Sequence, residues 1–202
     1  FKFLMWNDND TYTGKNYYNM DPFRNLAEVG QTYTLYGRWY ADLNYNKNFD
    51  GAYERAVTQT IREADSFTIK GAIFTHPTGY KLTGWNTERE GSGTSYETGR
   101  TYTKEYYSVL GVDNGKANLY AQWKPIDYTI RFDSNGGTGS MGDLYMTYDA
   151  ASALPACNFT APTGKVFTGW IDDAGNVYND QASVNNLAST DGALITLHAQ
   201  WE

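Results

Sequence analysis

Leu119-Tyr120-Ala121-Gln122-Trp123 and Leu197-His198-Ala199-Gln200-Trp201 are two copies of one motif, and Leu35-Tyr36-Gly37-Arg38-Trp39 is a third. Each copy follows a second tryptophan, and these are Trp6, Trp85 and Trp170. A motif that recurs at a long period indicates repeated small units that each bury the same apolar set. Because chemistry is normally carried by one unique group of residues, this repetition favours a spacer, a display arm or a binding array.

The second and third copies align at an offset of 85 positions, which takes Phe74 to Phe159 and Trp85 to Trp170. The same offset sets Asp42-Leu43 against Asp127-Tyr128 and Asp50-Gly51 against Asn135-Gly136. We therefore expect the two copies to run in step from their starts to the first tryptophan. Beyond it, the second copy is longer by 7 positions up to Trp123 than the third is up to Trp201. These extra residues are expected in loops, where added length costs little entropy.

The first copy is incomplete in this chain. Residues 1–6 align with 80–85, so the front half of a unit is absent. We predict the C-terminal half of a truncated repeat at residues 1–40, one repeat unit at 41–124 and another at 125–202, all part of a longer parent protein. Trp6 and Trp39 then have little to pack against. Residues 1–40 are therefore expected to pack onto the second unit or to pair with a segment outside the chain.

Composition narrows the class of protein. The chain has 202 residues, of which 16% are aromatic, so units of about 80 residues can each be filled by a few large rings. The net charge is −7 and Lys and Arg are not clustered, which argues against a nucleic-acid partner. No apolar run approaches the ~20 residues of a membrane span, so no span is expected in this fragment. The single cysteine, Cys157, aligns with Ala72 and is expected to be a small buried or half-buried side chain.

Residue patterning in the third unit predicts mainly strands. Residues 128–132 alternate apolar and polar side chains, which is typical of a half-buried strand. Asn135-Gly136 is a strong hairpin signal, and 144–148 fits the return strand. Residues 149–154 are expected to form one short helix, capped by Asp149 and ended by Pro155. Further strands are expected at 165–170 and 195–201. The prediction is a mostly β (α+β) unit with one short helix on a curved sheet, repeated with poorer patterning in the second unit.

Four short motifs carry a family resemblance. They are Asp-Ser-Asn-Gly-Gly-Thr at 133–138, Phe-Thr-x-Pro-Thr-Gly at 74–79 and 159–164, Thr-Gly-Trp at 83–85 and 168–170, and Leu-x-Ala-Gln-Trp at 119–123 and 197–201. Together they resemble the Listeria–Bacteroides repeat, also called the internalin B-repeat family, over essentially the whole chain. The resemblance implies tandem β-grasp-like (ubiquitin- or SUMO-like) units in secreted or wall-attached bacterial surface proteins, with no enzymatic activity. The second unit departs from the pattern at residues 49–53, where it lacks the Gly-Gly turn, so its first hairpin is an open question.

Two motifs resemble ligand sites but are better explained as structure. Gly137-x-Gly139-x-x-Gly142 matches a dinucleotide fingerprint, but a β-type segment follows where that motif needs a helix. Asp42-x-Asn44-x-Asn46-x-Asn48-x-Asp50 has calcium-like spacing, but Lys47 and Tyr53 occupy the positions that need Gly and Glu. Alternate residues of a strand share a face, so we interpret this row as the solvent side of a strand. A weak metal site formed by a few of its oxygens stays open.

The remaining candidates are histidines and aromatic residues. His198 occupies the position of Tyr36 and Tyr120, and His76 aligns with Ala161, so neither is expected to be catalytic. In the pairs Tyr17-Tyr18 and Tyr106-Tyr107, one ring of each is expected to be exposed. Such rings stack on sugars or anchor protein interfaces, although more often they cover an inter-repeat junction or a neighbouring strand. The cores of the complete units are expected to contain Trp85, Trp123, Trp170 and Trp201.

We therefore predict no catalytic, cofactor-binding or metal-ligating residues and no enzyme activity in this fragment. The first hypothesis is a stalk or interaction segment of a bacterial cell-surface or secreted protein, with short linkers such as 124–126 limiting the angle between units. The alternative is a binding module for a glycan or a host protein, suggested by exposed tyrosines and the long loop at 86–99. A third hypothesis is an accessory domain of a secreted glycan-degrading enzyme, which the flanking parent sequence would distinguish.

Overall fold

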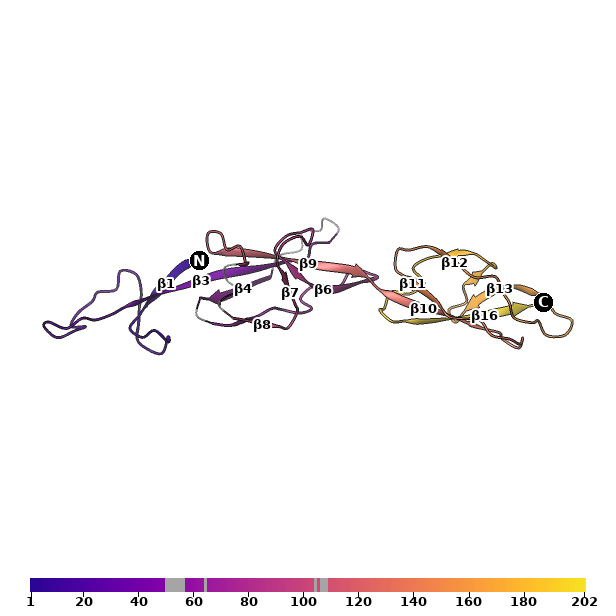
Figure 1. Ribbon diagram of the computed structural model, residues 1–202, viewed down its shortest axis with the longest axis horizontal. Coiled ribbons are helices and arrows are strands. Elements are labelled where there is room, and N and C mark those ends of the chain that lie inside the picture. Colours follow the sequence, from indigo (N-terminus) through magenta and orange to yellow (C-terminus); the bar gives the residue numbers. More distant parts are fainter. Residues whose placement is uncertain (50–56, 64, 104, 106–108) are drawn as a thin grey trace. The chain divides into compact units, whose positions relative to one another are not determined.

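The computed structural model describes residues 1–49, 57–63, 65–103, 105 and 109–202. These residues form sixteen β-strands and no α-helix. The chain divides into two compact units (Figure 1), unit 1 from 1–75 and 83–122, and unit 2 from 76–82 and 123–202. The predicted mostly β class is confirmed. None of the described segments forms a helix with the length and apolarity needed to span a bilayer.

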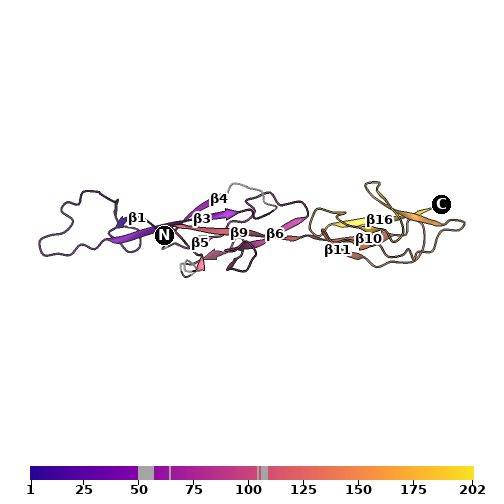
Figure 2. The ribbon, with the colours of Figure 1, turned by 90° about the horizontal axis from the view of Figure 1, so that it is seen from above.

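Unit 2 is built on a five-stranded sheet in the order β11-β10-β16-β13-β14. Its strands are β10 (Asp127–Asp133), β11 (Leu144–Thr147), β13 (Phe167–Asp172), β14 (Val177–Tyr178) and β16 (Leu194–Trp201). A second, two-stranded sheet pairs β12 (Ser152–Ala153) with β15 (Ser183–Val184). The first and last strands of the unit, β10 and β16, lie side by side and run parallel (Figure 2).

The core of unit 2 forms where alternating apolar side chains of these strands meet. Trp170 of β13 is fully buried at its centre. Its ring lies 5.0 Å from Phe132, 6.1 Å from Phe159 and 4.9 Å from Phe167, measured between ring centroids. Trp201 is half-buried, and its indole Nε1 donates a hydrogen bond to the carbonyl oxygen of Ser134 at 2.9 Å.

Unit 1 contains a seven-stranded sheet in the order β2-β1-β3-β9-β6-β7, with β4 also paired to β3. Its strands are β1 (Lys2–Asn7), β2 (Asn16–Tyr17), β3 (Tyr36–Asn46), β4 (Val57–Arg62), β6 (Tyr80–Asn86), β7 (Ser95–Tyr96) and β9 (Lys116–Pro125). A small sheet pairs β5 (Phe67–Thr68) with β8 (Thr101–Tyr102). As in unit 2, the first and last strands of the complete repeat, β3 and β9, pair in parallel. The predicted core tryptophan Trp85 is 1% exposed, whereas Trp123 is half-buried.

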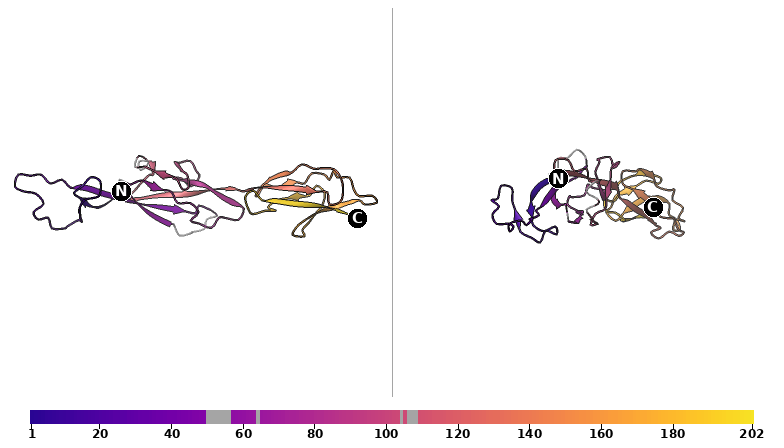
Figure 3. Two further views of the ribbon diagram at one scale, coloured as in Figure 1. Left: turned by 90° about the horizontal axis from the view of Figure 1, so that it is seen from below. Right: turned by 60° about the vertical axis from the view of Figure 1, so that its left-hand side comes forward.

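Residues 1–40 join the sheet of the second repeat, although the strand pairs of β1 are with β2 and with residues 36–40 of β3, which lie within 1–40 itself. A single long strand, β3, runs from the end of the truncated copy into the second repeat, and β1 and β4 pair with successive stretches of it. Phe1 therefore lies next to the middle of β3 (Figure 3). This packing does not cover the tryptophans, because Trp6 and Trp39 remain 37% and 40% exposed.

The short helix predicted at 149–154 is wrong. Asp149 has a φ of 63°, and Ser152–Ala153 form strand β12. The Asp149 carboxylate accepts hydrogen bonds from the Tyr80 hydroxyl at 2.7 Å and from Asn186 Nδ2 at 2.9 Å. Because the Asp149 side chain is engaged in these contacts, it cannot cap a helix. The segment before Pro155 is also too short to offset the cost of helix nucleation.

The predicted alignment of the first strands is also wrong by two positions. Tyr45 pairs with Leu119 across the parallel strands of the second repeat, and Phe132 pairs with Leu197 in the third. Asn48 Nδ2 donates to the Ala121 carbonyl at 2.9 Å, and Asn135 Nδ2 donates to that of Ala199 at 2.8 Å. The first strands thus correspond at an offset of 87, as from Asn48 to Asn135. A slip of two leaves the same side chains facing the core, so alternation alone could not detect it.

The first hairpin of the second repeat, an open question from the sequence, forms between β3 and β4. Its turn at 50–56 lies outside the described residues. The return strands correspond at the offset of 85, as from Ile61 to Met146, which pair with Ala41 and Tyr128. The two additional residues of the second repeat therefore lie between Asn48 and β4.

The extra length after the first tryptophan lies in loops, as predicted. Trp85 pairs with Tyr96, eleven positions later, whereas Trp170 pairs with Tyr178, eight positions later. The other additional residues fall between β8 and β9. The strands themselves keep their pairing, so the two units share one sheet plan despite their different lengths.

Replacing Trp170 with Ala should lower the free energy of unfolding of unit 2 by ~3–5 kcal/mol, because it removes a fully buried ring and leaves a cavity. Chemical denaturation followed by circular dichroism measures this change. Trp6→Ala is the matched control, since Trp6 occupies the equivalent position but is partly exposed. A loss at Trp170 no larger than the loss at Trp6 would contradict the core assignment.

Candidate functional site

A polar cluster in unit 2 surrounds His198 on the closing strand β16. His198 Nδ1 lies 2.7 Å from Asp133 Oδ2 at the end of β10, and Nε2 lies 3.0 Å from Asp173 Oδ1 in the loop after β13. These two carboxylates, Asp173 and Asp133, raise the pKa of His198 above its ordinary value of 6.5. The Asn135 amide and His198 in turn lower the pKa of Asp133. The cluster ties three segments together, but it contains no nucleophile.

This cluster predicts a pH dependence for unit 2. Because the pKa of His198 is raised in the folded state, its stabilising contribution is complete below the unfolded value of 6.5 and is lost as pH rises through the folded pKa. The free energy of unfolding of unit 2 should therefore fall from pH 6.5 upward. His198→Tyr, which installs the residue found at Tyr36 and Tyr120, should remove that decline. Denaturation curves over this pH range measure it, and an identical slope in both proteins would refute the assignment.

The long loop at 86–99 is organised by the buried side chain of Asn86. Asn86 Nδ2 donates to the Gly91 and Gly93 carbonyls and to Ser95 Oγ. Its Oδ1 accepts the backbone N–H groups of Glu88 and Gly93. Asn7 is buried in the same way at the equivalent hairpin of the first copy, where Nδ2 bonds Gly14 and Asn16. The loop is thus an ordered turn of unit 1, and the third repeat, with Ile171 at this position, has a shorter loop.

Sequence patterning gave no prediction for these asparagines. A signal was nonetheless present, since Trp-Asn occurs at 6–7 and 85–86 and a glycine follows at the same distance, at Gly14 and Gly93. A Cβ at either glycine would lie under 3 Å from neighbouring side-chain atoms. Close packing of the loop on its asparagine therefore requires glycine there.

The glycine-rich segment 137–142 precedes strand β11 and not a helix. Its Asn-Gly turn is present, with Asn135 and Gly136 at positive φ and a hydrogen bond from the Gly137 amide to the Ser134 carbonyl. After the turn, Thr138 exchanges backbone hydrogen bonds with Thr160 before the return strand begins. The segment therefore lacks the helix N-terminus on which a dinucleotide site depends.

The acidic and amide row of β3 is used in cross-strand hydrogen bonds. Asp42 Oδ1 accepts from Thr60 Oγ1 and Asn44 Oδ1 from Thr58 Oγ1, each at 2.9 Å. Asn46 Nδ2 donates to the Leu119 carbonyl. Asp50 lies outside the described residues. In the described part of the chain, no cluster of three or more His, Cys, Asp or Glu side chains has the arrangement of a metal site.

The other predicted positions lie apart from one another. His76 packs edge-on against Trp123, with ring centroids 5.3 Å apart. Cys157 is half-buried against the core of unit 2, and burial raises the pKa of its thiol. Of the first tyrosine pair, Tyr17 is buried and Tyr18 exposed, which confirms that expectation, whereas Tyr106-Tyr107 lies outside the described residues.

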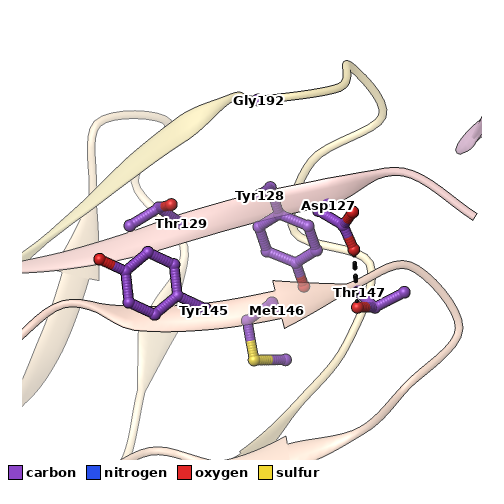
Figure 4. A pocket seen from close by; sticks show the side chains of 7 residues that line it. All are labelled: Asp127, Tyr128, Thr129, Tyr145, Met146, Thr147 and Gly192. Carbon is purple, nitrogen blue, oxygen red and sulfur yellow. Dashed lines mark hydrogen bonds between the residues drawn. The ribbon is translucent and has the colours of Figure 1, made fainter.

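A surface groove of unit 2, with a volume of about 230 Å³, lies beside β10 and β11 (Figure 4). Asp127 and Thr147 close one end through a hydrogen bond of 2.9 Å, and Tyr145 stands at the other. Tyr145 is 80% exposed, whereas Tyr128 and Met146 form a buried floor. A shallow groove with a free aromatic ring and a carboxylate can hold a sugar or a peptide side chain, but it has no paired acid and base for catalysis.

A second groove of unit 2, of about 440 Å³, is lined by residues 76–81, Ile126 and 189–191. Lys81 Nζ lies 2.6 Å from Asp191 Oδ1 across it, and the pKa of Asp191 is lowered mainly by this contact. Ile126, from the predicted linker, is buried and donates its amide to the Gly79 carbonyl at 2.9 Å. The charged groups Lys81 and Asp191 are already paired with each other. Together with the Ile126–Gly79 hydrogen bond, this pair holds the segment 76–82 within unit 2.

Comparison with known proteins gives a consistent result. The family model of the Listeria-Bacteroides repeat domain matches residues 42–122 and 128–200. The chain is similar to two proteins of Evansella cellulosilytica. One, named "Putative Gly-rich membrane protein", is 31% identical over 178 residues, covering 86% of this chain and 19% of that protein. The other, named "Putative membrane protein", is 32% identical over 99 residues, covering 47% of this chain and 14% of that protein. The chain thus spans about a fifth or less of each relative.

Proposed function

Because this chain belongs to the Listeria–Bacteroides repeat family, we propose that it is a non-enzymatic spacer and interaction segment of a surface- or membrane-associated bacterial protein. Tandem repeats and the names of the two relatives support a surface- or membrane-associated protein. We also propose that the protein is extracellular or wall-attached and that this segment has no catalytic activity. We also propose that each repeat is a β-grasp-like unit, since its terminal strands lie parallel at the centre of a mixed sheet.

The single observation that carries the spacer role is the pairing of first and last strands. In unit 2, Thr129 to Asp133 of β10 pair with Leu194 to His198 of β16, all in parallel. Parallel strands start at the same end of the sheet, so the unit is entered at one end of this pair and left at the other. A pull on the two chain ends therefore draws β10 and β16 past each other along their length.

This geometry loads all the hydrogen bonds between the two strands at once. Five residue pairs join β10 to β16, and five join β3 to β9. In contrast, a force applied at the same end of both strands opens the pairs one at a time. Repeats built in this way keep their length under tension, which suits a segment that holds another domain away from a surface.

We expect unit 2 to resist end-to-end pulling more strongly than pulling from one end of the β10–β16 pair. Single-molecule force spectroscopy with handles at Phe1 and Glu202 measures the first geometry. For the second, one handle is at Glu202 and the other at Ser140→Cys in a Cys157→Ala background. Ser140 lies in the exposed loop after β10, and Gly137 of this loop lies close to Trp201 at the end of β16. The peak unfolding force should be lower in the second geometry. Equal forces in both geometries would remove the physical basis of the spacer proposal.

A second candidate function is glycan binding at the groove of Tyr145, supported by the 80% exposure of this ring beside Asp127 and Thr147. Aromatic faces stack on sugar rings, and the carboxylate supplies a hydrogen-bond acceptor. A glycan array probed with the chain should then give signals that Tyr145→Ala abolishes. Val177→Ala, at another exposed apolar residue of unit 2, is the control that should leave them intact. An array that gives no signal, or signals that Tyr145→Ala does not change, would contradict glycan binding at this groove. The spacer role would then be the remaining proposal.

A further inference from the structure

Four large apolar side chains are exposed in unit 2, which the structure describes throughout. They are Tyr145 on β11, Val166 before β13, Val177 on β14 and Leu194 on β16. The core of the unit is formed by other residues, among them Trp170 and Leu197. Single exposed apolar residues are ordinary on protein surfaces, so the question is whether these four form a group.

Strand pairing places two of them on the face of the sheet that is turned away from the core. Tyr145 pairs with Thr129, which in turn pairs with Leu194. Residues paired across neighbouring strands share one face of a sheet, and consecutive residues of a strand alternate between the two faces. Both neighbours of Thr129, Tyr128 and Ile130, are buried in the core. Tyr145, Thr129 and Leu194 therefore form a row on the opposite face.

The other two apolar side chains lie on the same face. Val177 and His198 both pair with one residue of β13. Val166 exchanges backbone hydrogen bonds with Glu202, directly after β16. Both of these partners are an even number of positions from Leu194 on the closing strand, so they share its side of the sheet. The outer face of unit 2 is defined here as the sheet surface that carries Tyr145, Val166, Val177 and Leu194.

The second repeat has the same sheet plan but a polar residue at every equivalent position. The equivalents of Tyr145, Leu194, Val177 and Val166 are, in that order, Thr60, Lys116, Ser95 and Lys81. The fold of the repeat therefore does not require apolar side chains at these positions. Their exposure in unit 2 indicates a contact made by this surface and not a packing need of the sheet.

The outer face is wider than a site for one sugar ring. Of its four apolar side chains, Tyr145 alone lines the groove discussed above, so a sugar there would leave the other three uncovered. Tyr145 and Val177 lie on the outermost strands, and five strands spaced ~4.8 Å apart make the face about 19 Å wide. With the seven residues of β10 as its length, the face covers roughly 450 Å². Stable interfaces cover ~800 Å² per partner, so this area fits a transient protein contact.

The charge around these side chains is negative. Four carboxylates lie on the outer face or at its edge, and they belong to Asp127, Asp133, Asp143 and Asp173. The cationic groups beside them are those of Lys81, Arg131 and, when protonated, His198. Unit 2 as a whole has nine Asp and Glu against four Lys and Arg, so with neutral His it carries −5 of the net charge of −7. Such a surface repels nucleic acid and anionic lipid headgroups and attracts basic partners.

We propose that the outer face of unit 2 is the docking surface for a basic protein segment, in which Lys or Arg side chains surround aliphatic or aromatic ones. The apolar side chains of the partner pack on Tyr145, Leu194 and Val177, and its cations approach the carboxylates around them. This docking surface rests on the interaction role proposed above. It is independent of the pulling geometry that carries the spacer role.

The test selects a random peptide library on phage against the immobilised chain and then measures the affinity of a selected peptide in solution. Enriched peptides should combine Lys or Arg with aliphatic or aromatic residues, and their affinity should fall as salt is added. The comparison protein is the triple variant Tyr145→Thr, Leu194→Lys and Val177→Ser, which installs the residues of the second repeat. It should bind the peptide about tenfold more weakly or less, because it loses three apolar contacts and gains a repelling charge.

Asn158→Lys is the matched control. It adds the same charge on the segment 154–159, which packs on the core from the other side, and should leave peptide binding unchanged. Thermal unfolding checks that unit 2 stays folded in each variant. The single changes Tyr145→Thr and Val177→Ser should each weaken binding by a smaller factor, which keeps the test decisive if the triple variant is unstable.

A selection that enriches no basic sequences would overturn the proposal, as would a selected peptide that binds the triple variant as well as it binds the original chain. Sedimentation of the chain alone tests the other occupant of this face. A dimer that the triple variant disperses would replace the basic partner with a second copy of the chain. None of these results changes the unfolding forces that test the spacer role.

Discussion

The first tryptophan of each complete repeat holds the two halves of that repeat together. Trp170 lies on β13, in the back half, and receives rings from Phe132 and Phe159 in the front half and from Phe167 beside it. Trp85 is enclosed in the same manner by Tyr45 and Phe74. Burial of one large ring between segments distant in sequence accounts for a substantial part of the stability that so small a unit can have.

The residue before this tryptophan explains the Thr-Gly-Trp motif. Gly84 and Gly169 adopt φ values of 155° and 148°, and a Cβ there would lie within 2.9 Å of the Tyr96 or Tyr178 carbonyl oxygen. Only glycine allows the paired strand to approach so closely. The truncated copy carries Met5 at this position, which is not at positive φ, although the register shift is retained. The close approach is therefore one way, and not the sole way, to seat the tryptophan on the sheet.

Function in this chain depends on what the repeats leave outside their cores. The repeated aromatic residues are mostly enclosed, the charged pair Lys81–Asp191 is satisfied within unit 2, and His198 is held between two carboxylates. The groove at Tyr145 stays free, and it suits binding but presents no nucleophile with its base. The parallel pairing of the terminal strands, β10 with β16 and β3 with β9, is the basis of the proposed spacer role.

The sequence by itself determined the repeat, its two tryptophans, the strand positions and the placement of extra length in loops, because these depend on local periodicity and on motifs that recur. It also indicated that the histidines and glycines belong to the scaffold. Only the tertiary structure decided the alignment of the first strands, since a slip of two residues preserves which side chains face the core and is visible only in the pairing of Tyr45 with Leu119 and of Phe132 with Leu197. It likewise replaced the expected helix with strand β12, because the carboxylate of Asp149 bonds to Tyr80 and Asn186, partners far away in sequence. Long-range contacts of this kind leave no periodic signal, and they also distinguish a buried Trp170 from an exposed Trp6 that has the same local motif.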